Sequence, residues 1–343
     1  MQKEIEMLKV VAKLDLNDND IEKIESILKE KNLDWSVVLQ GIFKHKIVNI
    51  FFFIVKNNRL LEYIPNYVIK ALISNWEYSK IKMKNYKKLI KDATVKLNER
   101  NIPYALIKGF DTNDKLYFEY DENIREFNDL DLFVSEENLT EAEKVFIEDG
   151  FVAGDYSLAS ENVDKVSRYN QIRIKMGSHQ IYNLVKKINF SDDGMIYGPL
   201  IVDINFEVYL GGKDKKQNPI STKDMLETRK LRENYEGIKY YSLDEYYTLV
   251  QLIYHFYRET TEDGEVDFNL HNLCDIHLYL KHYADKWNLS ILKEIIMKHK
   301  MEEVFWFALY FVDVTFETSY MEVILDKDID YSEKYKQHIE FWK

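Results

Sequence analysis

The sequence of 343 residues predicts an α+β protein, with a small mixed β-sheet, flanking helices, and helical regions at both ends. Through residues 1–100, and again from residue 243, apolar residues recur every three or four positions, which is the spacing of a helix face. Between these regions, short apolar runs and alternating apolar and polar residues indicate strands. The chain has only 11 Gly and 4 Pro, which favours long helices over tight turns.

Residues 1–100 are predicted to form an N-terminal helical region. The segment NDNDIEKIESILKEKN places Ile21, Ile24 and Ile27 on one helical face after an Asn/Asp-rich start. LDWSVVLQGIFKHKIVNIFFFIVKNN and YVIKALISNWEYSKIKMKNYKKLIKDATVKLNERN continue the pattern. The N-terminus lacks the apolar centre of a secretion signal, and IVNIFFFIVKNN is too short to span a bilayer. We therefore expect a cytoplasmic protein with no membrane partner.

Residues 101–212 are predicted to form the α/β core. IPYALI and LDLFV have the composition of short strands, and NLTEAEKVFIEDG that of a helix running from an N-cap at Asn138 to a stop at Gly150. SRYNQIRIKM, HQIYNLV and PLIVDINFEVYL follow as the expected strands of an antiparallel sheet. The core should thus combine one helix with several strands.

Residues 213–343 are predicted to be mainly helical. The polar loop GGKDKKQN at the start of this region lacks the pattern of a phosphate-binding P-loop. In HNLCDIHLYLKH, the side chains of His271, Cys274 and His277 could hold Zn²⁺, although their spacing matches no common structural zinc site. A half-buried helix with ordinary histidines is the interpretation that we favour.

Two aspartates alternate with leucines in the predicted strand NDLDLFV. Because side chains on a strand alternate between its faces, Leu130 and Leu132 can enter a core while Asp129 and Asp131 stand together on the other face. Two negative charges so close together are unfavourable unless a positive charge compensates them, and a divalent cation does so directly. Mg²⁺ prefers carboxylate oxygens together with substrate phosphates. An exposed strand also alternates in this way, so the pair alone leaves a structural interpretation open.

The segment LIVDINFEVYL repeats the alternation, with Asp203, Asn205 and Glu207 on one face. A third carboxylate on a neighbouring strand would complete a site for in-line displacement at phosphorus. Upstream, the dipeptide Lys108-Gly109 lies between a predicted strand and a predicted helix. Glycine allows close backbone approach, and a helix start offers N–H groups to an anion. These features together predict a metal and phosphate site.

The motifs follow one another along the chain as LIKG at 106–109, Arg125, DLDLFV at 129–134, VDINFEV, and YSLDEYYTLVQLIYH. In this order they resemble the motifs of the nucleotidyltransferase superfamily, and most of all those of its branch of uncharacterised nucleotidyltransferases. The resemblance covers most of the chain. It implies transfer of a nucleoside monophosphate (NMP) from a nucleoside triphosphate (NTP) to an acceptor hydroxyl, with release of pyrophosphate and with Mg²⁺ or Mn²⁺ as cofactor.

The resemblance also implies roles for individual residues. Asp129 and Asp131 would bind the metal ions, and Asp203 would be the third carboxylate and would help to activate the acceptor hydroxyl. The triphosphate would lie against Lys108 and Gly109. Loss of Asp129 or Asp131 should then abolish activity without unfolding the chain, and relief of the like-charge cluster should stabilise the metal-free fold.

Further residues are implied around this centre. Arg125 is expected to neutralise phosphate charge, and the acceptor pocket is expected to include Asn205, Glu207 and His255. ATP is the expected NTP. The formal net charge of −12 disfavours RNA as the acceptor, so we expect a small molecule, a peptide or a protein.

Two departures from the family pattern keep other functions open. The serine that usually follows the glycine is Phe110 here, and the branch's histidine after the third acid is Asn205, which cannot take a proton at neutral pH. Asp111 and Asp114 would also repel a phosphate bound nearby unless they turn away. A non-catalytic nucleotide-binding or regulatory module is therefore one alternative. A toxin or antitoxin component that modifies RNA or protein is another.

Overall fold

The computed structural model describes residues 2–190, 196–208, 220–261, 268–283, 286–326 and 328–342, and the GGKDKKQN loop lies outside them. The chain forms two compact units. The helical unit comprises Met1–Glu77, Leu116–Arg125 and Leu249–Lys343, and the sheet unit comprises Tyr78–Lys115 and Glu126–Thr248. Each unit is therefore assembled from stretches that are separated in the sequence. The predicted division at residues 100 and 212 stays a prediction drawn from the sequence pattern.

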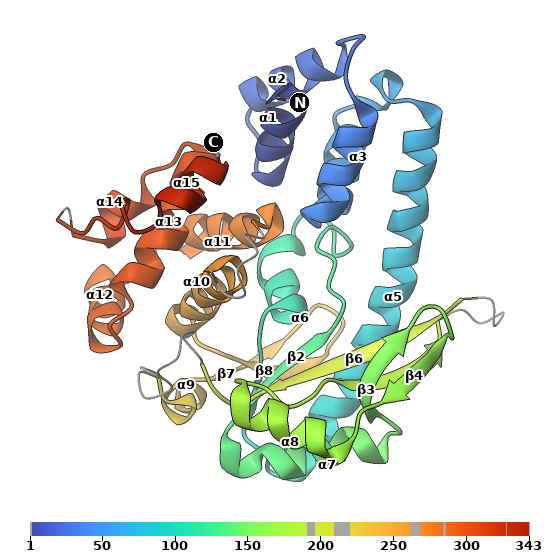
Figure 1. Ribbon diagram of the computed structural model, residues 1–343, viewed down its shortest axis with the longest axis vertical. Helices are drawn as coiled ribbons and strands as arrows, with labels where there is room; N and C mark the ends of the chain where they lie inside the picture. Colours follow the sequence, from blue (N-terminus) through green and yellow to red (C-terminus); the bar gives the residue numbers. More distant parts are fainter. Residues whose placement is uncertain are drawn as a thin grey trace. The chain divides into compact units, whose positions relative to one another are not determined.

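The helical unit is built from short helices at both ends of the chain (Figure 1). They are α1 (Gln2–Ala12), α2 (Asp18–Leu28), α3 (Trp35–Lys44), α4 (Val48–Asn57), the first part of α5 (Asn66–Glu99), most of α10 (Glu245–Thr261), α11 (Leu270–Tyr283), α12 (Leu289–Lys298), α13 (Glu302–Phe316), α14 (Tyr320–Ile324) and α15 (Lys336–Trp342). None of the helices in the described ranges is long and apolar enough to cross a membrane.

Two of the helix starts in this unit, those of α2 and α3, are held by side-chain caps. Asn17 and Asp20 form a capping box at the start of α2, and the Asp34 carboxylate accepts hydrogen bonds from the backbone N–H groups of Ser36 and Val37 at the start of α3. Such caps satisfy backbone donors that have no partner within the helix. The local sequence alone therefore determines where these helices begin.

Two histidines of α11 are buried in the helical unit. Burial lowers the pKa of His271 to about 3 and that of His277 to about 4. The ring of His277 lies 4.8 Å from that of Phe316, measured between centroids. These positions belong to the core of the unit, and α11 is buried along most of its length, whereas a half-buried helix was expected.

Acid should therefore destabilise the helical unit through these histidines. Their folded pKa values lie below the unfolded value of about 6.5, so the unfolded chain binds more protons as the pH falls below that value. Each histidine should cost about 3 kcal/mol of unfolding free energy between pH 7 and pH 4. Urea unfolding across this pH range measures the loss. His277→Phe should reduce the pH dependence, and His282→Phe, at an exposed position of the same helix, should not. Equal slopes for both variants would contradict the assignment.

The described strands form one eight-stranded mixed sheet in the order β4-β3-β5-β6-β2-β1-β8-β7 (Figure 1). β2 pairs in parallel with β6, β1 pairs in parallel with β8, and the other neighbours are antiparallel. The strands are β1 (Tyr104–Leu106), β2 (Leu130–Val134), β3 (Val152–Ser157), β4 (Asn162–Lys165), β5 (Leu184–Asn189), β6 (Tyr197–Asn205), β7 (Lys230–Glu233) and β8 (Lys239–Ser242). The predicted fold class, a mixed sheet with flanking helices, is confirmed.

The core of the sheet unit joins the sheet to α5 and to α7 (Leu139–Glu148). Leu130 and Leu132 of β2 and Val202 and Ile204 of β6 are each at most 2% exposed. The apolar half of both alternating patterns therefore faces the core, as predicted, and the opposite half belongs to the other face of the sheet. Helix α7 ends before Gly150, whose φ of +86° suits the predicted glycine stop.

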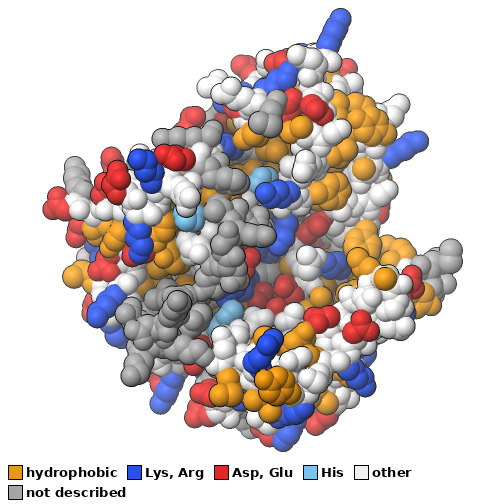
Figure 2. Space-filling view, viewed as in Figure 1, with side chains coloured by type: hydrophobic (Ala, Val, Ile, Leu, Met, Phe, Trp, Pro, Cys, Tyr) orange, Lys and Arg blue, Asp and Glu red, His pale blue; other side chains and the backbone are white. Residues whose placement is uncertain are grey.

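The prediction of a strand over SRYNQIRIKM is wrong, because residues 168–177 form helix α8 (Arg168–Gly177). The hydroxyl of Ser167 accepts a hydrogen bond from the backbone N–H of Asn170 and caps the helix. The apolar residues of this segment fit both the period of a helix and that of a strand, and no side chain of α8 is buried. Tyr169 and Met176 are 74% and 73% exposed. Figure 2 shows hydrophobic and basic side chains together over this part of the molecule.

The sheet also extends further along the chain than the sequence pattern indicates. β7 and β8 form a hairpin within the region predicted to be mainly helical, with Gly237 at φ +75° in the turn. β8 then pairs with β1, and Leu106 lies opposite Ser242. Each strand of the hairpin has four residues, and β7 is mostly exposed, so the segment shows too little apolar periodicity to indicate strands.

Candidate functional site

The site begins with two neighbouring parallel strands that each carry an aspartate at the same level. In the register of β2 and β6, Asp131 lies opposite Asp203. Residues paired in this way project their side chains to the same face of a sheet. Asp129 lies in the bend just before β2 begins at Leu130, so the alternation of the strand does not by itself place its side chain. The structure thus brings together carboxylates that are far apart in the sequence. This is the arrangement that the two alternating motifs predict.

Tyr86 of α5 joins the segment just before β2 to the middle of β6. Its hydroxyl donates to the backbone carbonyl of Asn128 and accepts a hydrogen bond of 3.2 Å from the backbone N–H of Ile201. Burial raises the pKa of Tyr86, and the nearby charges of Asp129 and Asp203 raise it further. The sequence analysis missed Tyr86 because it lies in an ordinary amphipathic helix.

Tyr86→Phe should destabilise the sheet unit. The variant removes the hydroxyl that serves two backbone groups, and each buried group left without a partner costs about 1–3 kcal/mol. The loss can be measured by urea unfolding. Tyr169→Phe, at a position that is 74% exposed in the same unit, is the matched control and should leave stability unchanged. If the two variants behave alike, this account of Tyr86 is wrong.

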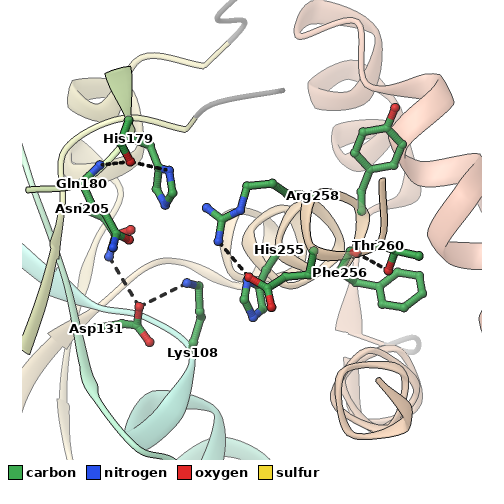
Figure 3. A network of polar contacts seen from close by, with 12 residues as sticks. Lys108, Asp131, His179, Gln180, Asn205, His255, Phe256, Arg258 and Thr260 are labelled. Carbon is green, nitrogen blue, oxygen red and sulfur yellow. Dashed lines mark hydrogen bonds and ion pairs between the residues drawn. The ribbon is translucent and has the colours of Figure 1, made fainter. Parts of the chain in front are cut away.

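Lys108 places a cation on the aspartate pair. Its Nζ lies 3.1 Å from Oδ1 of Asp131, and the two side chains are 9% and 6% exposed (Figure 3). The backbone of Lys108 has φ +50° and ψ −143°. L-residues rarely adopt this conformation, and such strain costs about 1–3 kcal/mol. Strain of this kind persists only where the surroundings impose it, and it concentrates at functional sites.

Gly109 follows with φ +23° at the start of the short helix α6 (Gly109–Thr112). A Cβ at this position would lie 3.4 Å from Cβ of Phe127 and 3.5 Å from the carbonyl oxygen of Asp129. These are ordinary contact distances, so it is the positive φ rather than crowding that favours glycine here. Sequence and structure agree that Lys108 and Gly109 lie beside the aspartates.

Asn205 ends β6 and adds a second donor to the Asp131 carboxylate. Its Nδ2 lies 3.5 Å from Oδ1 of Asp131 (Figure 3). The same Nδ2 lies 3.3 Å from the carbonyl oxygen of Asp203. The side chain is 2% exposed, so in this structure it supports the aspartates. Glu207 lies just beyond the strand and is partly buried. For both residues, a role in an acceptor pocket stays a prediction.

His179 is a site residue that the sequence analysis missed. Its carbonyl oxygen accepts hydrogen bonds from the backbone N–H groups of Phe206 and Glu207, and the adjacent Gln180 pairs with Asn205. In Figure 3 the imidazole of His179 points in the same direction as the Asn205 side chain. The chain therefore has an imidazole beside the end of β6, where the family pattern has a histidine in place of Asn205. A lone His in a predicted strand gives no signal for this.

The charge of Asp111 is compensated by a cation, and the charged form of Asp114 is disfavoured by burial. Asp111 forms a buried ion pair of 2.8 Å with Lys115, whose Nζ also donates to Thr248. The hydroxyl of Tyr240 donates to Asp114, and burial raises the pKa of that carboxyl. These contacts answer the concern that both acids would repel a phosphate.

Arg125 belongs to the helical unit, whereas Lys108 and the aspartates belong to the sheet unit. Its Nε lies 3.0 Å and 3.1 Å from the two carboxylate oxygens of Asp275, and its Nη2 lies 2.7 Å from Oδ2. Both side chains are buried. Because Nε and Nη2 of Arg125 both donate hydrogen bonds to Asp275, we interpret Arg125 as a structural residue. Its expected role in phosphate binding stays a prediction.

His255 also lies in the helical unit, on α10. Its Nδ1 is 3.6 Å from Oε1 of Glu259, which Arg258 also contacts (Figure 3). Its expected place in an acceptor pocket stays a prediction.

The donor chemistry of the aspartate face fits a hard divalent cation, since carboxylate and amide oxygens are the ligands that Mg²⁺ prefers. Across the described ranges, no group of three or more His, Cys, Asp and Glu side chains is arranged to hold a metal ion. In this arrangement the ammonium of Lys108 is the cation in contact with Asp131.

Comparison with known proteins identifies one family. The model of the family described as "Uncharacterised nucleotidyltransferase" matches residues 31–317. No curated protein matches the chain. Among solved structures, an antigenic nucleotidyltransferase-like protein from Paracoccidioides brasiliensis is 15% identical over 64% of this chain and 90% of its own, with a TM-score of 0.35. JHP933 from Helicobacter pylori is 18% identical over 71% and 85%, with a TM-score of 0.33.

Proposed function

Because the chain belongs to the family of uncharacterised nucleotidyltransferases, we propose that it transfers an NMP from an NTP to an acceptor hydroxyl. In this reaction the acceptor oxygen bonds to the α-phosphorus, the bond from the α-phosphorus to the bridging oxygen breaks, and pyrophosphate leaves. The observation that carries the proposal is the register of β2 and β6, which pairs Asp131 with Asp203.

Asp129, Asp131 and Asp203 would hold Mg²⁺ or Mn²⁺ in this proposal. A bound divalent ion would supply charge stabilisation for the triphosphate and would lower the pKa of the acceptor hydroxyl. Asp203 would orient that hydroxyl and accept its proton. Asn205 would keep the Asp131 carboxylate in position through the contact described above. Because phosphoryl transfer asks little covalent chemistry of the protein, positioning and charge should dominate catalysis.

Lys108 and Gly109 would hold the triphosphate. The ammonium of Lys108 is already directed to the aspartate face, and Gly109 leaves room for close approach of the backbone. Phe110 has no hydroxyl to offer, and it is packed edge-on against Phe127 and Tyr240. This side chain is therefore part of the core, and phosphate contacts fall to its neighbours.

ATP is the NTP that we expect. The net charge of −12 favours a small-molecule, peptide or protein acceptor over RNA, because binding to a nucleic-acid backbone depends largely on Lys and Arg. An acceptor on RNA or on a protein would also suit a toxin or antitoxin component.

A non-catalytic nucleotide-binding module is the second candidate function, and the replacement of a serine and a histidine by Phe110 and Asn205 favours it. One experiment separates the two. The full chain is mixed with each α-labelled NTP and with Mg²⁺ or Mn²⁺, and pyrophosphate release and label transfer are followed. Transfer supports the enzyme. Thermal stabilisation by NTP without pyrophosphate release, with a range of acceptor hydroxyls present, would favour the binding module.

A further inference from the structure

Lys108 occupies a backbone position that glycine would occupy without strain. Its φ of +50° and ψ of −143° lie where a side chain is disfavoured, and the next residue is a glycine. The chain thus holds a lysine where the backbone favours a residue with no side chain. We look for the reason in what the side chain contacts.

The ammonium of Lys108 is buried on the carboxylate of Asp131. Nζ lies 3.1 Å from Oδ1, and Asn205 Nδ2 approaches the same oxygen at 3.5 Å. A buried charge is costly unless it is paired, so each of these two charged groups keeps the other in place. The lysine therefore supplies the positive charge that the clustered aspartates require.

A divalent ion on these aspartates would compete with that ammonium. Asp203 lies opposite Asp131 in the strand register, so a metal shared by the two would bind beside the Lys108–Asp131 contact. Two cations at one carboxylate repel each other strongly in a site that excludes water. The long side chain of lysine has rotatable bonds that let the ammonium leave.

We propose that Lys108 is an exchangeable internal counter-ion: its ammonium neutralises Asp131 before metal binds, and it is released to the NTP triphosphate when metal arrives. This inference rests on the proposed function and adds a regulation of the same site. It explains why a lysine is kept in a strained position. With Lys108 in place the aspartates should bind a metal ion weakly. Binding should strengthen when a nucleotide is present, because the released ammonium can then pair with the triphosphate.

The test is Mn²⁺ binding to the full chain without nucleotide, followed by the EPR signal of free Mn²⁺. Lys108→Met removes the competing charge and should bind Mn²⁺ at least about tenfold more tightly than the wild type. The same variant should bind a non-hydrolysable ATP analogue at least about tenfold more weakly. These opposite changes distinguish a counter-ion from general damage to the site, which would weaken both ligands.

Two further variants make the result decisive. Lys108→Arg keeps the charge and should retain nearly the wild-type Mn²⁺ affinity. Lys108→Gly suits the backbone and should tighten Mn²⁺ binding as Lys108→Met does, so it tests the inference even if the methionine variant fails to fold. Unchanged or weaker Mn²⁺ binding in both neutral variants would overturn the inference, while NMP transfer by the wild type would leave the proposed function standing. Absence of Mn²⁺ binding in every form would overturn both.

Discussion

Asp203→Asn is expected to lower NMP transfer by about 10³-fold or more while the chain stays folded. The carboxylate faces Asp131 across two parallel strands, and its charge is needed for a metal ion and for the acceptor proton. Metal ligands and general bases each contribute several kcal/mol to such a reaction, and every 1.36 kcal/mol is about tenfold in rate. The measurement is label transfer from an α-labelled NTP, alongside urea unfolding of the same preparation.

Asp131→Asn should lose transfer to the same degree but should also cost stability. The earlier expectation for the two aspartates was that removing either would stabilise the metal-free fold by relieving like-charge repulsion. For Asp131 the ion pair with Lys108 changes that expectation, because its loss leaves a buried ammonium without its partner. We expect the free energy of unfolding to fall by up to about 3 kcal/mol, which is the lower limit for breaking a buried ion pair, because Asp203 remains near the ammonium.

The double variant Lys108→Met with Asp131→Asn is the matched control. It removes both charges, so it should recover most of the stability lost in Asp131→Asn and still fail to transfer NMP. Wild-type transfer by Asp203→Asn or by Asp131→Asn would refute the assignment of the aspartate face. If Asp131→Asn were as stable as the wild type, the contact between Lys108 and Asp131 would not contribute to the free energy of unfolding.

The second large effect concerns Asp275 in the helical unit, where Asp275→Ala should cost about 3–5 kcal/mol of unfolding free energy. The carboxylate accepts from the guanidinium of Arg125, and from the hydroxyl of Tyr117 at 2.6 Å. Burial alone would raise the pKa of Asp275, but the charge of Arg125 lowers it, so the group stays ionised. The substitution therefore removes the carboxylate that pairs with a buried guanidinium, and it leaves the Tyr117 hydroxyl only the weaker contact with the sulfur of Cys274. Urea unfolding measures the loss.

Asp326→Ala is the matched control, because Asp326 forms an exposed ion pair with Lys293 in the same unit. Exposed pairs contribute only about 0–1 kcal/mol, so this variant should unfold nearly as the wild type does. Combining Arg125→Met with Asp275→Leu should recover much of the stability, since apolar side chains can replace a buried ion pair.

The same pair of residues decides between two roles for Arg125. If Arg125 is structural, Arg125→Met should be destabilised to a degree similar to Asp275→Ala. A stable Arg125→Met variant with weakened NTP binding would restore the phosphate-binding role that the family resemblance implies.

Much of the fold follows from local patterns. Apolar spacing and capping residues such as Asn17 and Asp34 mark helices, and the alternation in DLDLFV and VDINFEV separates core residues from the aspartate face. The prediction failed where one segment fits both the helix and the strand period, as in α8, or where strands are too short to show a period, as in β7 and β8.

The sequence by itself determined the fold class and the family, and it predicted the three acids as site residues, because side-chain periodicity and motif order are properties of short stretches. Only the tertiary structure decided which residues meet. It set the register that pairs Asp131 with Asp203 and joined Arg125 to Asp275, 150 positions away. It also placed Lys108 on Asp131 through a strained backbone. Contacts of this kind depend on how the whole chain packs, since a buried charge takes its partner from whichever segment the fold brings beside it.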